Sequence, residues 1–238
     1  RMRYFWLSVK AVFLKDIVVE LRARQVIPTM IVLGMLIVWI LRTASEAASI
    51  SAVVIGPAAL WIAFLFSGLL AQERSFAVEQ QNDCMYGLLM APVDVGTIFL
   101  AKLLVNVVML CIFEIIIVPV VMVSFGLAIH GRWAGLIGVL LLGNLGICGV
   151  GTLFSAMVQL ARSFSALLSI IVLVILMPMM IPATLAMLMV FGAIPDELAG
   201  VGNMVFAGNF KSALGYMVAF DAVFVTACWL LFGLVVKE

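Results

Sequence analysis

Residues Gln72–Lys102 read QERSFAVEQQNDCMYGLLMAPVDVGTIFLAK, a polar stretch between two long apolar segments. The flanking runs Ile50–Leu70 and Ile98–Val123 are both long enough to cross a hydrocarbon layer of about 30 Å, which takes roughly 20 apolar residues. A charged loop of this size between two membrane spans must lie in water, on one side of the bilayer. The stretch therefore decides the fold class, because it separates two predicted transmembrane helices.

Composition places the rest of the chain in the same class. Of its 238 residues, 66% are hydrophobic and only 11% are charged, and the mean hydropathy is +1.33. A water-soluble fold needs many charged residues on its surface, whereas here lipid can solvate the outside. The formal net charge is only +1, so no nucleic-acid partner is expected.

Hydropathy predicts an all-α polytopic membrane protein with six transmembrane helices. The predicted spans are Val26–Leu41, Ile50–Leu70, Ile98–Val123, Trp133–Met157, Phe164–Phe191 and Ala213–Val236. With this topology ten of the thirteen Lys and Arg residues lie on the side of the two termini, and only Arg42, Arg132 and Lys211 lie on the other side. Basic residues favour the cytoplasmic side of a membrane protein, so we expect cytoplasmic N- and C-termini.

Residues 1–25 mix apolar and basic side chains ahead of the first span. This stretch is longer and more mixed than the n-region of a secretory signal, which should be short and followed by a small-residue cleavage site. We predict an N-terminal helix lying in the cytoplasmic interface, with an extension of the first span as the alternative. Residues 26–238 then form one six-helix transmembrane domain.

Motifs for nucleotide binding, nucleophilic catalysis and metal binding are missing from the sequence. It contains no GxxxxGK[ST] loop and no GxSxG elbow, so ATP hydrolysis would have to occur in another chain. No cluster of His, Cys or carboxylates has ligand spacing, and we predict no metal site. His130, the sole histidine, is either an axial ligand for haem iron or a hydrated side chain at the membrane interface.

Two carboxylates lie within predicted spans, where an ionised group costs of order 3 kcal/mol. Glu114 is in the middle of the third span, shortly before Pro119, and both an intramembrane function and a structural polar contact remain open for it. Asp221 is expected nearer the outer end of the sixth span, within reach of water. Lys102, near the cytoplasmic end of its span, is expected to extend its amine to water as an anchor.

Small residues recur at three- and four-residue spacing in the fourth span and share one helical face. Such residues let helix backbones approach closely in lipid. We interpret this face as a packing surface, with a substrate-lining groove as the alternative. Its members are Gly135, Gly138, Leu142, Gly146, Gly149, Thr152 and Ala156.

The polar stretch between the second and third spans has an uneven distribution of charge. If Gln72–Leu89 is helical, Glu79 and Asp83 lie on one side with Phe76, while Leu88 and Leu89 offer apolar contacts. Ala91-Pro92-Val93-Asp94 then ends this helix, and Asp94 can cap the next span. A solvated turn with no partner is the alternative interpretation.

Leu60–Leu104 resembles the signature region of the haem exporter protein B family, the permease subunits of the ABC transporter of cytochrome c maturation. Weaker agreement extends to KDIVVELRARQVIPTMIVL and GVGTLFSAM. The QQNDC stretch at 80–84 departs from the family pattern, and the segment after Met187 agrees only in hydropathy. The matching residues are Trp61, Ala63, Phe64, Leu65, Arg74, Ser75, Phe76, Gly87, Leu88, Leu89, Ala91, Pro92, Val93, Asp94, Ile98, Phe99 and Lys102.

The resemblance implies an ABC-2-type membrane domain in a bacterial inner membrane, with no catalytic residues of its own. It implies a cytoplasmic ATPase subunit as partner, two copies of each subunit, other maturation proteins and a haem chaperone. ATP would bind the partner, and haem would enter only at the level of the complex. The ATPase-coupling segment would be a cytoplasmic helix that includes Arg74, Phe76, Glu79, Asp83, Leu88 and Leu89.

Two functional alternatives remain at the level of sequence. An ABC-2-type permease for another substrate would share the six spans and the cytoplasmic loop. A secondary transporter would place more ionisable residues near mid-membrane and often show repeat symmetry. The family resemblance favours haem handling, either export of haem or release of a haem-loaded chaperone.

Overall fold

The computed structural model describes residues 2–23, 25–81, 95–129, 131–160, 165–192 and 209–235. Within these ranges the chain forms seven helices and no strand. They are α1 (Met2–Ala23), α2 (Val26–Ala47), α3 (Ala52–Gln81), α5 (Val95–Phe125), α6 (Trp133–Leu160), α7 (Ser165–Val190) and α8 (Phe210–Val235). Six of them, α2 to α8, are long and apolar enough to cross a membrane, which confirms the predicted number of spans.

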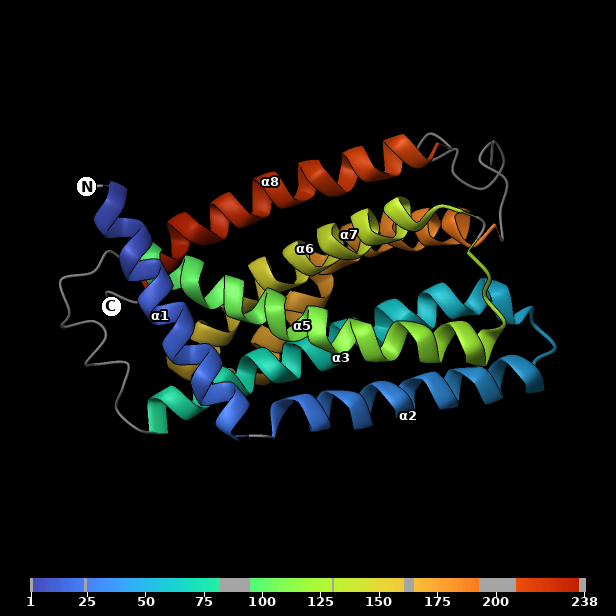
Figure 1. The fold of residues 1–238 in the computed structure, drawn as a ribbon, viewed down its shortest axis with the longest axis horizontal. Helices are drawn as coiled ribbons and strands as arrows, with labels where there is room; N and C mark the ends of the chain where they lie inside the picture. Colours follow the sequence, from blue (N-terminus) through green and yellow to red (C-terminus); the bar gives the residue numbers. More distant parts are fainter. Residues whose placement is uncertain are drawn as a thin grey trace.

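The six long helices form one bundle, and α1 lies across one end of it (Figure 1). At this end α3 and α8 finish and α5 begins, while the opposite end carries the turns that join α2 to α3 and α5 to α6. Helix α6 is central, because it packs against α3, α5, α7 and α8. The described helices therefore cross the bundle six times, and the chain returns to the end where it started.

The N-terminal helix is a separate element. It ends at Ala23, and α2 begins at Val26 with a different direction (Figure 1). The alternative in which residues 2–23 extend the first span is therefore wrong. Helix α1 packs against α5, where Val9 and Val12 are buried together with Ala101.

The polarity of the bundle is the reverse of that of a soluble protein. Large apolar side chains such as Trp39, Ile115 and Val123 are exposed on its outside, with Val123 85% exposed. Inside, polar residues are buried beside the apolar core, among them Asn106, Asn144 and Asp221. This distribution is what a lipid environment requires, since lipid replaces water as the solvent of the outer surface.

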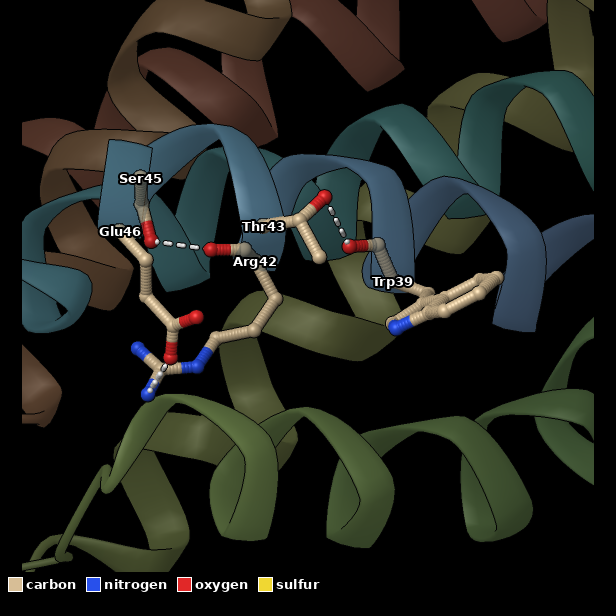
Figure 2. Close-up of polar contacts among 5 residues, drawn as sticks. All are labelled: Trp39, Arg42, Thr43, Ser45 and Glu46. Atoms are coloured by element: carbon tan, nitrogen blue, oxygen red, sulfur yellow. Dashed lines mark hydrogen bonds and ion pairs between the residues drawn. The ribbon is translucent and has the colours of Figure 1, made fainter. Parts of the chain in front are cut away.

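Helix α2 continues six residues past the predicted end of the first span. Its last two turns contain polar residues that the helix itself satisfies, as Figure 2 shows. Arg42 Nη2 lies 2.7 Å from Glu46 Oε1, and the Thr43 hydroxyl donates to the Trp39 carbonyl at 3.1 Å. The span predicted from hydropathy ends before the first charged residue, but these local contacts let the helix continue to Ala47.

The centre of the bundle is built around aromatic side chains that meet glycines. The Trp61 ring packs edge-on against Phe64, with 5.6 Å between ring centroids, and Phe64 packs in the same way against Phe113 of α5. Gly143 of α6 lies directly against the Trp61 ring, so a Cβ there would collide with it. These contacts join α3, α5 and α6 without a gap for larger residues.

Candidate functional site

A buried ion pair joins the N-terminal helix to the bundle. Asp16 of α1 lies with its Oδ2 3.2 Å from Lys102 Nζ of α5, and its Oδ1 lies 3.1 Å from Lys15 Nζ. The side chains of Asp16 and Lys102 are only 5% and 2% exposed. The expectation that Lys102 extends its amine to water is wrong, because α1 covers this end of α5 and supplies the counter-charge there.

Four helices meet beside this ion pair. A cavity of about 10 Å³, close to the space of one water molecule, is lined by Glu20 of α1, Met30 of α2, Gln72 of α3 and Asn106 of α5. The Ser67 hydroxyl of α3 donates to the Met30 carbonyl at 3.2 Å. Polar contacts thus join α1 to α5 and α3 to α2 at one end of the bundle.

Helix α3 extends beyond its membrane span towards the predicted coupling segment. The helix is continuous from Ala52 to Gln81, so the first ten residues of this segment prolong the span instead of forming a separate helix. Arg74 is exposed, and its Nη1 donates to the Thr29 hydroxyl of α2 at 3.2 Å. Thr29 in turn donates to the Gln25 carbonyl at 2.7 Å, which connects Arg74 to the start of α2.

The structure leaves most of the predicted coupling residues untested. Phe76 and Glu79 belong to the last turns of α3, but the described side chains do not include theirs. Asp83, Leu88 and Leu89 lie outside the described residues, as does His130. Of the predicted coupling set, only Arg74 therefore has a described contact.

A series of buried polar side chains follows the contact between α3, α5 and α6, and most of these residues are not among those predicted from the sequence. Asn106 Nδ2 donates to the Thr152 hydroxyl at 2.9 Å, and Gln72 Nε2 donates to Cys148 Sγ at 3.8 Å. Asn144 Nδ2 donates to Cys111 Sγ at 3.5 Å. The available signal was the presence of amides within apolar helices, since a polar side chain in a membrane helix faces the bundle interior.

Glu114 joins this series through Asn144. It is 7% exposed, its carboxylate interacts with the side chain of Asn144, and its Oε1 has no hydrogen-bond partner within the described residues. Glu114 also lines a groove of about 280 Å³ between α5 and α6. The predicted intramembrane position is correct, and Asn144 is a polar contact that the sequence did not identify.

Asp221 is enclosed between three helices. It is 3% exposed, and neither carboxylate oxygen has a hydrogen-bond partner within the described residues. A Cβ added to Gly146 of α6 would lie 2.7 Å from Asp221 Oδ1 and would also meet Met179 of α7. The expectation that Asp221 reaches water is wrong, because α6 and α7 cover it.

The small-residue face of α6 serves packing. Gly146 accommodates Met179 and Asp221, and Gly149 faces Val225 of α8 at 2.8 Å from the position of a Cβ. Gly138 is an exception, since no heavy atom lies within 4 Å of its Cβ position. The interpretation of this face as a packing surface is confirmed for Gly146 and Gly149.

Among the residues that the structure describes, no three His, Cys, Asp or Glu side chains gather as metal ligands. Cys111, Cys148 and Cys228 are unpaired thiols within membrane helices. The polar groups of the described interior are amides, hydroxyls, the Asp16–Lys102 ion pair and the carboxyl groups of Glu114 and Asp221. This set suits helix association and the binding of polar groups within the membrane.

Comparison with known families gives one match. Residues 7–233 match the CcmB protein family, so the match includes most of α1, the six membrane helices up to residue 233 and the polar stretch between α3 and α5. Comparison with individual curated proteins gives no significant match. This match extends far beyond Leu60–Leu104, the region that carries the resemblance in the sequence. The chain therefore belongs to the CcmB protein family, the haem exporter protein B permeases of cytochrome c maturation.

Proposed function

We propose that this chain is the non-catalytic membrane subunit that couples ATP hydrolysis by a separate cytoplasmic ATPase to haem handling. The observation that carries the proposal is membership of the CcmB protein family over residues 7–233. The sequence contains no GxxxxGK[ST] loop, so the nucleotide has to bind another subunit. Two permease and two ATPase copies would form the core, working with other maturation proteins and a haem chaperone.

The distribution of charge supports a cytoplasmic location for the end that carries α1. Lys10, Lys15 and Arg22 of α1 lie at this end, together with Arg74. In a bacterial inner membrane this excess of basic residues favours the cytoplasmic side. Exposed apolar side chains of α1 support a position for this helix in the membrane interface, and they include Trp6, Leu7, Leu14 and Val18.

The route of coupling that we propose begins in the segment between α3 and α5. A push on the end of α3 would enter the membrane directly, because the helix is continuous from Gln81 into its span. Arg74 would pass the movement to the start of α2 through Thr29. The Asp16–Lys102 ion pair would carry α1 with α5, so the four helices would tilt as one unit.

This coupling serves either of two outcomes. The tilting of the bundle could move haem across the membrane, or it could release a haem-loaded chaperone from the complex. The sequence contains no CxxCH attachment site for haem. Our proposal therefore assigns this chain the transfer of mechanical energy, with haem bound at the level of the complex.

The test is co-expression with a candidate ATPase subunit, followed by purification of the complex and measurement of ATP hydrolysis. We expect Glu79→Lys with Asp83→Lys to abolish association or to uncouple hydrolysis. The acidic face would become basic, and it would be repelled by its binding surface on the ATPase or would no longer fit that surface. The yield of cytochrome c should also fall in this double variant. Normal assembly, hydrolysis and cytochrome c yield in this double variant would remove the coupling assignment.

Glu46→Lys provides the matched control. Glu46 is an exposed acidic residue at the other end of the bundle, where it pairs only with Arg42 among the described residues (Figure 2). An exposed pair of this kind contributes at most about 1 kcal/mol to stability. We expect this variant to assemble and hydrolyse ATP as the unmodified complex does.

A further inference from the structure

The outer face of the bundle has a groove between α5 and α6 that contains a carboxyl group. Its volume is about 280 Å³, close to the lower end of the range for small-molecule sites. The groove is open on the lipid side, where Ile115 and Ile137 are 75% and 55% exposed. Apart from Glu114 and the Cys111 thiol its lining is apolar, formed by Ile115, Val118, Pro119, Ile137, Leu140 and Leu141.

Glu114 lines this groove and carries a buried carboxyl oxygen without a described hydrogen-bond partner. The residue is more than nine-tenths buried, and its Oε1 has no partner within the described residues. Asn144 interacts with the carboxylate from the interior and also donates to Cys111, so it holds Glu114 at the groove. A buried acceptor without a donor costs about 1–3 kcal/mol, which a ligand that donates a hydrogen bond would recover.

The backbone supplies a second acceptor at the same place. Pro119 lies within α5 and has no N–H, so it cannot donate to the carbonyl of Ile115 four residues earlier. Ile115 and Pro119 both line the groove. A carboxyl oxygen without a donor and a carbonyl without its usual helical donor therefore belong to residues that line the groove, and their complement is a donor group attached to an apolar body.

We propose that the α5–α6 groove is a lateral binding site for a lipid-phase molecule with an apolar chain and a donating head, an amine or a hydroxyl. The head binds Glu114 and the chain lies along Ile137 and Leu141. A second copy of this chain fits less well. Two copies meeting through this same face would bring acceptor against acceptor, because the exposed side chains around Glu114 that the structure describes are apolar.

The site is independent of the ATPase-coupling role, and it can be tested without nucleotide. Membranes containing the full chain are treated with dicyclohexylcarbodiimide, a reagent that enters lipid. A carboxyl group adds across one of its C=N bonds, and the acyl group then shifts from oxygen to nitrogen to leave a stable N-acylurea. Mass spectrometry of the digested protein locates the modified residue.

We expect modification of Glu114 and none of Asp221, which is equally buried but enclosed by Gly146 and Met179. Modification at position 114 should disappear in Glu114→Gln. It should also decrease in Leu141→Trp, because a larger side chain at the edge fills the groove and leaves the carboxyl unchanged. Equal modification of Glu114 and Asp221, or none of Glu114, would overturn the proposal.

Competition identifies the class of ligand. Dodecylamine and dodecanol are added before the carbodiimide, and dodecane of the same chain length is the matched control. We expect the amine, the alcohol or both to protect Glu114 and the alkane to leave it reactive; the stronger of the two protectors identifies the head group. Equal protection by dodecane would mean a purely apolar surface and would contradict the proposal. If Glu114 were protected only when two permease copies are cross-linked to each other, the groove would be an interface between copies, and this result would also contradict the proposal.

Discussion

Three ionisable residues of the membrane helices differ in their surroundings, although the sequence gives them similar contexts. Lys102 is paired with Asp16, Glu114 lies at an open groove, and Asp221 is enclosed without a described partner. Hydropathy identifies all three as unusual because a charge in an apolar helix is costly. It cannot identify their partners, since Asp16 and Asn144 come from other helices and meet them only in the folded bundle.

The ion pair between α1 and α5 leads to a prediction for stability. Lys102→Met should lower the free energy of unfolding by about 3–5 kcal/mol, because the buried Asp16 would keep only the exposed Lys15 as a counter-charge. Thermal denaturation of the purified protein in detergent measures the loss as a lower midpoint temperature. Lys10→Met is the control on α1, since the side chain of Lys10 is exposed.

A second substitution separates the ion pair from simple packing. Asp16→Asn combined with Lys102→Met removes both charges, so most of the lost stability should return. A double variant as unstable as Lys102→Met alone would show that the lysine side chain contributes through packing and not through its charge.

At the scale of single helices, the sequence predicts the presence of each helix better than the position of its end. All six predicted spans are helices, but α2 runs on to Ala47 and α3 to Gln81, past the ends that hydropathy gave them. Hydropathy detects where lipid ends, whereas a helix ends where its backbone hydrogen bonds stop. At α5 the end coincides with Gly126, whose φ of 65° is in the left-handed region that favours glycine.

Helix α6 allows a direct comparison of two glycines. Gly143→Ala should destabilise the protein by about 1–3 kcal/mol, because the new methyl group would overlap the Trp61 ring. Gly138→Ala should cause no loss, since no heavy atom lies within 4 Å of the added Cβ and alanine favours helix. The two midpoint temperatures of thermal denaturation test this difference, and equal values would contradict the packing assigned to Gly143.

At the scale of the whole molecule, composition and the Leu60–Leu104 motif were sufficient to predict the class and the family. The six spans and the match over residues 7–233 confirm both. This family match also favours haem handling over an unrelated permease or a secondary transporter. The sequence could not predict that α1 crosses the end of the bundle or that α6 is central, because these arrangements depend on contacts between distant helices.

The coupling role that we propose would make the two ends of the bundle unequal, and photo-cross-linking measures this difference most directly. A photoreactive phenylalanine analogue is placed at Phe76, in the last turns of α3, or at Trp133, an exposed aromatic at the opposite end where α6 begins. Membranes that contain the permease and its ATPase are then irradiated. We expect the analogue at position 76 to capture the ATPase and the analogue at position 133 to capture none. Capture from position 133, or no capture from position 76 in a complex that still co-purifies, would contradict the coupling role.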